Sequence, residues 1–264
     1  MAHQPRSIHS SKWGRSSPIV VLSPWPGKTA VLLSSVNNRL SIESMMGING
    51  SATCVLNFDN AKGYLIGKEN KGLSSMFTMM NLERIIVGIQ GLGIAETAYQ
   101  NSLAYCKERK QGKSNDNKNN ETDLIIKHAD IRRSLMTMKS LIEGQGSLAF
   151  WLSQQVDVSL NHSNDQIRKE ADDMVSLMTP VVKSFFSDTG MEITNEAIQV
   201  FGGYGYTKDQ GIEQLFRDNR ITPIYEGTNS VQAIDLVYRK ILNNKIFDRY
   251  ISQLTNCLLY TSPS

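Results

Sequence analysis

The sequence predicts a mainly α-helical protein, an antiparallel helical bundle preceded by a small β segment. From Leu73 onward, apolar residues recur at spacings of three and four, which is the period of one face of a helix. Before Leu73, short apolar stretches are separated by Gly, Asn and Asp, as is typical of strands joined by turns. Because three or four long helices are joined by loops, we expect an antiparallel bundle.

The β segment is expected between Val36 and Gly67. Residues 54–58 alternate between apolar and polar, and the three apolar residues 64–66 lie between two glycines. Residues 1–40 carry Ser, Pro and basic residues with little periodicity, so we expect them to be atypical, either disordered or not native sequence. We expect the same of the tail, 243–264.

The first long helix is expected to begin after Leu73 and to end near Gly112. A loop rich in Asn, Lys and Asp follows over 112–121. A second stripe of apolar residues with the same helical period then runs from Ile131 to Val156. These two stripes predict two long helices joined by a solvated loop.

A third stripe of apolar residues begins at Ala171 and contains Pro180, which we expect to kink the helix because proline removes one backbone hydrogen bond. Gly190 is expected to separate this helix from a shorter one that ends at Gly202 and Gly203. A glycine-rich and aromatic connector follows, and the last periodic stretch is Val231–Ile241.

Composition and charge exclude several classes of function. The 264 residues carry 28 basic and 25 acidic side chains without a dense basic block, so nucleic acid is not expected to be the main partner. The three cysteines contain no CxxC pair and the four histidines lack metal-ligand spacing, so neither a disulfide framework nor a metal site is predicted. No apolar run approaches the roughly 18 residues that cross a bilayer, and we expect a cytoplasmic protein.

The sequence Tyr225-Glu226-Gly227-Thr228 places a carboxylate just before a predicted helix. Glycine allows an unusual backbone angle and Thr228 is a suitable N-cap, so Glu226 would be a base on a rigid edge. The alternative is structural, since a Glu near a helix N-terminus stabilises the helix dipole by about 0.3–1 kcal/mol.

A second candidate is the glycine-rich stretch Gln199–Tyr206, QVFGGYGY. Its glycines would let backbone N–H groups approach a ligand closely, while a Gln and two Tyr offer hydrogen bonds and stacking. The alternative is a glycine C-cap followed by a turn. The pattern is not GxGxxG after a strand, so a Rossmann site is not predicted.

Cationic side chains form two further candidates. Arg109 lies among Lys107, Lys110 and Lys113 at the end of the first predicted helix, where cations can bind a phosphate or simply complement the helix dipole. Arg84 lies in an otherwise apolar stretch and is either an interior anion contact or the partner of the adjacent Glu83.

Five segments occur in an order that is far more specific than any of them alone: MGINGSATCVLNF, GYLIG, NLERIIVGIQGLGIAETAYQNSLAYCKER, QVFGGYGYT and RDNRITPIYEGTNSVQAIDLVYRKIL. In this order they resemble the C-terminal part of the acyl-CoA dehydrogenase family, from about Ser41 to Leu242. The MGIxGS element and the extended loop after the first helix are most similar to the long subfamily that includes 3-(methylthio)propanoyl-CoA dehydrogenase.

The resemblance implies a remnant of a middle β-domain over 41–70 and the family's antiparallel four-helix bundle over 71–242. It also implies that Glu226 is the base that removes the α-proton of an acyl-CoA thioester, while the β-hydride passes to N5 of FAD and a 2-enoyl-CoA forms. An electron transfer flavoprotein is implied as electron acceptor, and a homo-oligomer, a dimer or tetramer, as the assembly.

The same resemblance assigns further site residues and no metal. Those that match FAD contacts are Arg109, Gln111, Gln199, Gly202, Gly203, Thr228, Asn229 and Ser230. The first two match contacts to the flavin phosphates that reach across a subunit boundary, and the next three match a loop that holds the ADP part in the neighbouring subunit. Those assigned to the substrate side are Arg84, Asn81, Tyr225 and Gly227, with Asn81 standing where the family has an acidic partner for the arginine.

Two other classes of function are alternatives. One is a non-enzymatic relative, such as a flavin-containing DNA-protection protein, and the other is an interaction bundle without a cofactor. Glu226 favours the enzyme, and the low net charge disfavours DNA. Because the segments that complete the family's acyl pocket have no counterpart in this sequence, we expect a fragment that binds FAD weakly and has little activity alone.

Overall fold

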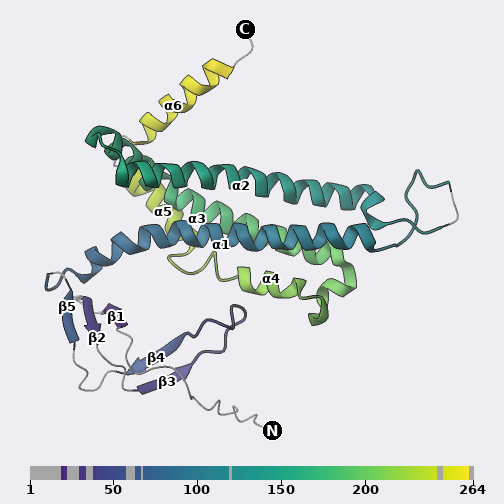
Figure 1. Ribbon diagram of the computed structural model, residues 1–264, viewed down its shortest axis with the longest axis horizontal. Coiled ribbons are helices and arrows are strands. Elements are labelled where there is room, and N and C mark those ends of the chain that lie inside the picture. The colour runs from purple at the N-terminus through teal and green to yellow at the C-terminus, as the bar shows by residue number, and fades with distance from the viewer. Residues whose placement is uncertain are drawn as a thin grey trace. The chain divides into compact units, whose positions relative to one another are not determined.

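The computed structural model describes residues 19–22, 30–33, 38–57, 63–66, 68–118, 121–242 and 246–261 (Figure 1). The chain divides into two compact units. One comprises residues 1–45 and 49–79, and the other comprises residues 46–48 and 80–264. The candidate site residues all belong to the second, helical unit.

The first unit contains two small antiparallel sheets. Their strands are β1 (Ile19–Leu22), β2 (Ala30–Leu33), β3 (Asn38–Ile42), β4 (Cys54–Asn57) and β5 (Gly63–Ile66). β2 lies between β1 and β5, while β3 pairs with β4. β4 and β5 correspond to the predicted strands, although Phe58 lies outside the described residues. β1 and β2, rich in Val, Ile and Leu as strands commonly are, were not expected within residues 1–40.

Three long helices form the body of the second unit, namely α1 (Gly72–Glu108), α2 (Ala129–Asn161) and α3 (Asp165–Phe201) (Figure 1). The largest core cluster takes buried apolar side chains from all three. These include Ala95 and Tyr99 from α1, Leu135 and Met138 from α2, and Ile193 and Ala197 from α3. All six side chains are at most 9% exposed. The predicted mainly helical bundle is confirmed.

α3 runs without interruption through Pro180 and Gly190, so the prediction that Gly190 separates two helices is wrong. Gly190 is buried where α1 comes close: a Cβ at this position would lie 3.0 Å from the carbonyl oxygen of Gly91 and 2.6 Å from Nδ2 of Asn219. A Cβ at Gly91 would lie 3.1 Å from the carbonyl oxygen of Phe186. The two glycines therefore allow α1 to pack closely on α3.

The connector after α3 contains a helix that the sequence did not predict. After the 3₁₀ turns η2 (Gly202–Tyr206) and η3 (Lys208–Gln210), the chain forms α4 (Ile212–Asn219). Eight residues are too few for a clear helical period, although Ile212 is almost fully buried.

The MGI part of the MGIxGS element docks on α4. The backbone N–H of Ile48 donates to Oδ1 of Asp218 at 2.5 Å, and Nη1 of Arg217 donates to the carbonyl oxygen of Met46 at 3.2 Å. A Cβ at Gly47 would lie 2.3 Å from the carbonyl oxygen of Arg217, which explains the glycine at this position.

The C-terminal part of the chain is also helical. α5 (Asn229–Ile234) continues into a π-helix, η4 (Asp235–Leu242), so the predicted helix over 231–241 is present with a change of winding. α6 (Ile246–Thr261) follows within the tail that we expected to be atypical. Ile246 is buried in a cluster with Met174 and Leu177 of α3. No helix in the described ranges is both long and apolar enough to cross a membrane.

Candidate active site

The turn that joins α4 to α5 contains two successive residues with left-handed backbone. Glu226 has a φ of 56° and Gly227 a φ of 86°. Positive φ is uncommon for a residue with a side chain and costs on the order of 1–3 kcal/mol, so it persists only where the surroundings enforce it. Such strained residues are concentrated at functional sites.

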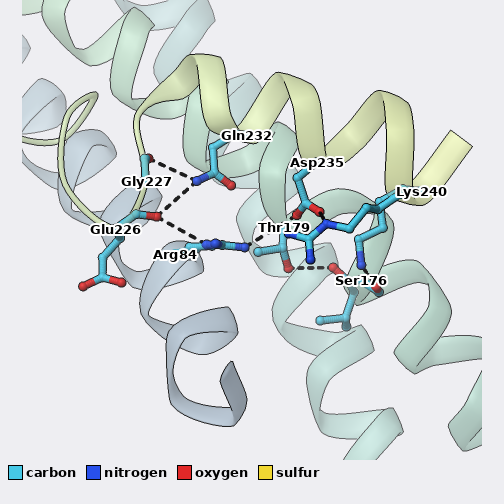
Figure 2. Close-up of polar contacts among 10 residues, drawn as sticks. Arg84, Ser176, Thr179, Glu226, Gly227, Gln232, Asp235 and Lys240 are labelled. Carbon is cyan, nitrogen blue, oxygen red and sulfur yellow. Dashed lines mark hydrogen bonds and ion pairs between the residues drawn. The ribbon is translucent and has the colours of Figure 1, made fainter. Parts of the chain in front are cut away.

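Two side chains hold the backbone of this turn (Figure 2). The carbonyl oxygen of Glu226 accepts hydrogen bonds from Nε of Arg84 at 3.3 Å and from Nε2 of Gln232 at 3.1 Å. Nε2 of Gln232 also lies 3.1 Å from the carbonyl oxygen of Gly227. Because Gln232 is fully buried, its amide is a fixed support.

Arg84 is itself an interior residue, 6% exposed. Its Nη1 lies 3.5 Å from Oδ2 of Asp235, which is equally buried, and Nε of Arg239 lies 2.5 Å from the other oxygen of Asp235. Arg84 therefore pairs with Asp235 and not with the adjacent Glu83, and its assignment to the substrate side stays a prediction. Figure 2 shows the guanidinium between Asp235 and the Glu226 carbonyl.

The side chain of Glu226 extends away from the contacts that hold its backbone. Figure 2 shows its carboxylate pointing away from Arg84. Among the residues that the structure describes, none donates a hydrogen bond or forms an ion pair to this carboxylate, and none accepts from the Glu226 backbone N–H. A half-buried carboxylate on a rigid turn is suited to accept a proton from a bound molecule.

The other residues of this cluster have structural contacts. The hydroxyl of Tyr225 donates to Oε1 of Gln90 on α1, and burial raises the pKa of Tyr225. Oγ1 of Thr228 accepts from the N–H of Val231 at 3.4 Å, which confirms the predicted N-cap. Ser230 and Asn81 are exposed.

A second cluster surrounds an open hollow of about 980 Å³ at the end of α1 and α3. It brings Arg109 and Gln111 together with Gln199, Gly202 and Gly203, all of which the sequence had assigned to a cofactor. The other lining side chains include the cationic Arg133 and the acidic Asp130 and Glu196. This volume is at the upper end of the range for small-molecule sites.

Aromatic side chains line this hollow. The guanidinium of Arg109 lies 5.3 Å from the ring centre of Tyr204, and Tyr105 stacks on Phe201 at 4.2 Å. The first contact places an aromatic ring beside the cation, and Tyr105 and Phe201 line the same hollow, so the lining suits a ligand that combines rings with negative charge.

The loop after α1 is fixed through the buried carboxylate of Asp123. That carboxylate accepts from Nζ of Lys127 at 2.7 Å and from the N–H of Ser114 at 2.9 Å, and these bonds, led by the one from Lys127, hold the pKa of Asp123 well below its usual range. The backbone of Asp123 pairs with Gln111 and Gly112 at 2.9 Å. Gln111 is therefore held in place beside Arg109.

The two clusters lie at different places along α3. Asp188 contacts Asn229 of the first cluster, and Gln199 lines the second. Eleven residues of helix correspond to about 17 Å at 1.5 Å per residue. Residues assigned from the sequence occur in both clusters. The sequence did not indicate Gln232 and Asp235, whose three-residue spacing places them on the same side of the predicted helix, nor Arg133 of the second cluster or the buried Lys183.

Comparison with known proteins decides the family. Residues 70–242 match the profile described as acyl-CoA dehydrogenase, C-terminal domain. The chain belongs to the acyl-CoA dehydrogenase family. This confirms the resemblance drawn from the five ordered segments.

Individual proteins that are similar to this chain carry the names of acyl-CoA dehydrogenases. A 3-methylmercaptopropionyl-CoA dehydrogenase from Ruegeria pomeroyi is 41% identical over 205 residues, which cover 78% of this chain and 35% of the relative. The solved butyryl-CoA dehydrogenase from Megasphaera elsdenii matches with a TM-score of 0.64 and 28% identity, covering 83% of this chain and 54% of that one.

A Bacillus anthracis acyl-CoA dehydrogenase solved in complex with FAD shares the fold, with a TM-score of 0.75 and 21% identity over 86% of this chain and 41% of that one. The chain spans about a third of the length of the Ruegeria pomeroyi relative.

Proposed function

We propose that this chain is the base-bearing part of an FAD-dependent acyl-CoA dehydrogenase, in which Glu226 removes the α-proton of an acyl-CoA thioester. The observation that carries the proposal is the Glu226 turn. Its backbone is strained and tied by Arg84 and Gln232, while its carboxylate and its N–H have no partner among the described residues. That combination supplies a proton acceptor and a backbone donor on one rigid residue.

The proposed reaction converts an acyl-CoA into a 2-enoyl-CoA. The Cα–H bond breaks, its proton passes to the carboxylate of Glu226, and the electron pair forms the new double bond as a hydride leaves Cβ. When bound, FAD supplies the acceptor for that hydride. The N–H of Glu226 can donate to the thioester oxygen, where negative charge develops as the proton leaves.

The hollow around Arg109 fits a dinucleotide such as FAD. The guanidinium of Arg109 and the side-chain amides of Gln111 and Gln199 can bind phosphate oxygens. The backbone at Gly202 and Gly203 borders open space, since a Cβ at either position would meet no atom within 4 Å. We propose that this hollow holds the phosphate and ADP part of the cofactor, and that Thr228 and Ser230 contact the flavin.

The assembly and electron acceptor are proposed from the family. A homo-oligomer, a dimer or tetramer, is the proposed assembly. An electron transfer flavoprotein is the proposed acceptor of the electrons.

Replacement of the base tests the proposal. In the full-length protein that carries this chain, Glu226→Gln is expected to lower acyl-CoA dehydrogenation at least about 100-fold with FAD still bound, because an isosteric amide cannot take the proton. Flavin absorbance per protein and acyl-CoA-dependent reduction of a dye are the measurements.

The control is Glu192→Gln, which changes an exposed carboxylate on α3 and is expected to leave both quantities unchanged. Turnover by Glu226→Gln within a few-fold of the unmodified protein would exclude Glu226 as the base. Bound FAD without turnover of any acyl-CoA by the unmodified protein would favour the non-enzymatic alternative.

A further inference from the structure

A lysine is buried beneath the Glu226 turn. Lys183 of α3 has no exposed surface, although lysine is almost never fully buried unless it is paired. Its ammonium group donates to Oδ1 of Asn229 at 2.8 Å. This contact joins residues 46 positions apart and connects the middle of α3 to the first residue of α5.

The side chain of Asn229 is occupied entirely by α3. Its Oδ1 accepts from Lys183, while its Nδ2 donates to Oδ1 of Asp188 at 2.7 Å and to Oγ of Ser187 at 3.0 Å. Both ends of the amide therefore face the helix beneath it. The family resemblance assigns Asn229 to the flavin, but these contacts give its side chain an internal task.

This network fixes the part of the turn that Arg84 and Gln232 do not reach. The backbone N–H of Asn229 donates to the carbonyl oxygen of Pro223 at 3.1 Å, which closes the loop that contains Glu226. One end of the loop is held through the carbonyl of Glu226, and the other through the side chain of Asn229. Movement of Asn229 would move Glu226, three residues earlier.

The charges around Lys183 come from three elements. Asp188 lies on the same helix, Arg84 on α1 and Glu226 on the turn. Burial lowers the pKa of Lys183 to about 8, while Asp188 and Glu226 act in the opposite direction and Arg84 acts with burial. The charged form of Lys183 is therefore stabilised by only a few neighbouring groups, as expected of a buried cation with a defined partner.

We propose that Lys183 and Asn229 are positioning residues for Glu226: their hydrogen bond fixes the start of α5 on α3 and thereby sets the direction of the base. The proposal rests on the proposed function of Glu226. It adds two side chains that touch neither the substrate nor the reacting atoms.

The first test separates positioning from binding in the FAD-loaded full-length protein. Lys183→Met and Asn229→Ala are each expected to lower kcat about ten-fold or more, with KM and FAD content within about two-fold, because a base displaced by a fraction of an ångström loses rate rather than affinity. The double variant is expected to be no worse than the more damaged single variant, because both remove the same contact.

Lys240→Met is the matched control. Lys240 also ties the α5–η4 helix to α3, through Oγ of Ser176, but away from the Glu226 turn (Figure 2). Its loss is expected to leave kcat within about two-fold. An unchanged kcat in Asn229→Ala, or an equal fall in Lys240→Met, would overturn the positioning role. Asn229→Ala carries this test even where Lys183→Met fails to fold.

The second test does not depend on activity. Backbone hydrogen exchange over residues 226–232 of the 264-residue chain is expected to become at least about ten-fold faster in Asn229→Ala, and to stay unchanged in Lys240→Met. Faster exchange in an enzyme whose Glu226→Gln variant remains active would uphold the network but reject the base. Unchanged exchange in Asn229→Ala would reject the network whatever the base is.

Discussion

At the scale of single residues, the contacts of the Glu226 and Gly227 backbone explain why this turn is rigid. The positive φ is unfavourable for Glu226, although glycine adopts it readily, and it persists because Arg84 and Gln232 bind the carbonyl group of Glu226 and Gln232 also binds that of Gly227. The strain therefore implies support from elsewhere in the chain. That support comes from α1 and α5, and not from neighbouring residues of the turn.

Gly227 offers a test of this rigidity. A Cβ at Gly227 would lie 2.9 Å from Nε2 of the buried Gln232, and the φ of 86° disfavours any side chain. Gly227→Ala is expected to reduce the free energy of unfolding by about 1–3 kcal/mol and to lower kcat, because the Gln232 hydrogen bonds must shift. Chemical denaturation and steady-state kinetics are the measurements.

Gly211→Ala is the control for Gly227→Ala. Gly211 also has a positive φ, 68°, but a Cβ there would meet no atom within 4 Å. We expect this variant to lose stability from backbone strain alone and to keep its kcat. Equal kcat values for the two variants would contradict a role for the Gln232 contact in holding the base.

The sequence could indicate Glu226 as a candidate site residue, but not the distant side chains that hold its turn in place. The YEGT pattern and the Thr228 cap are local and are present as expected. Arg84 and Glu226 are 142 residues apart, and the hydrogen bond between them depends on how α1 packs against the turn. Lys183 gave no signal because a single lysine in a helix usually faces solvent.

At the scale of secondary structure elements, glycines decide how closely α1 and α3 approach. The sequence suggested a helix break at Gly190 because glycine is common at helix ends. The structure uses it within a continuous helix, where Gly91 of α1 lies against it. A helix end and a close contact between helices both favour glycine because it has no side chain, so the local sequence pattern could not distinguish the two roles. α4 was missed for another reason, since eight residues carry little periodic signal.

The close approach of α1 and α3 makes a prediction about Gly190. Gly190→Ala is expected to lower the free energy of unfolding by about 1–3 kcal/mol, because overpacking against Asn219 and the Gly91 carbonyl exceeds the gain in helix propensity. Gly93→Ala, at an exposed position of α1 with no atom within 4 Å of the added Cβ, is expected to stabilise the helix by up to about 1 kcal/mol. Thermal or chemical denaturation measures both, and a stabilised Gly190→Ala variant would contradict the close contact.

At the scale of the whole molecule, the chain presents two sites with different tasks. The Glu226 turn offers a proton acceptor, and the Arg109 hollow offers cationic and amide donors in a space large enough for a nucleotide. The family match covers residues 70–242, whereas the chain spans 35% of its Ruegeria pomeroyi relative. The proposed reaction is therefore one for the full-length protein, with Glu226 as the proposed base in this part of it.

Exchange of the substrate α-proton with solvent reports directly on the group that removes it. When the FAD-loaded full-length protein binds an acyl-CoA in D₂O, mass spectrometry of recovered substrate is expected to show deuterium at the α-carbon, because Glu226 takes the proton and returns a deuteron from solvent. The Glu226→Gln variant is expected to show no such exchange, and Glu192→Gln to exchange normally. Exchange by Glu226→Gln at a rate near that of the unmodified protein would contradict the assignment of Glu226 as the base.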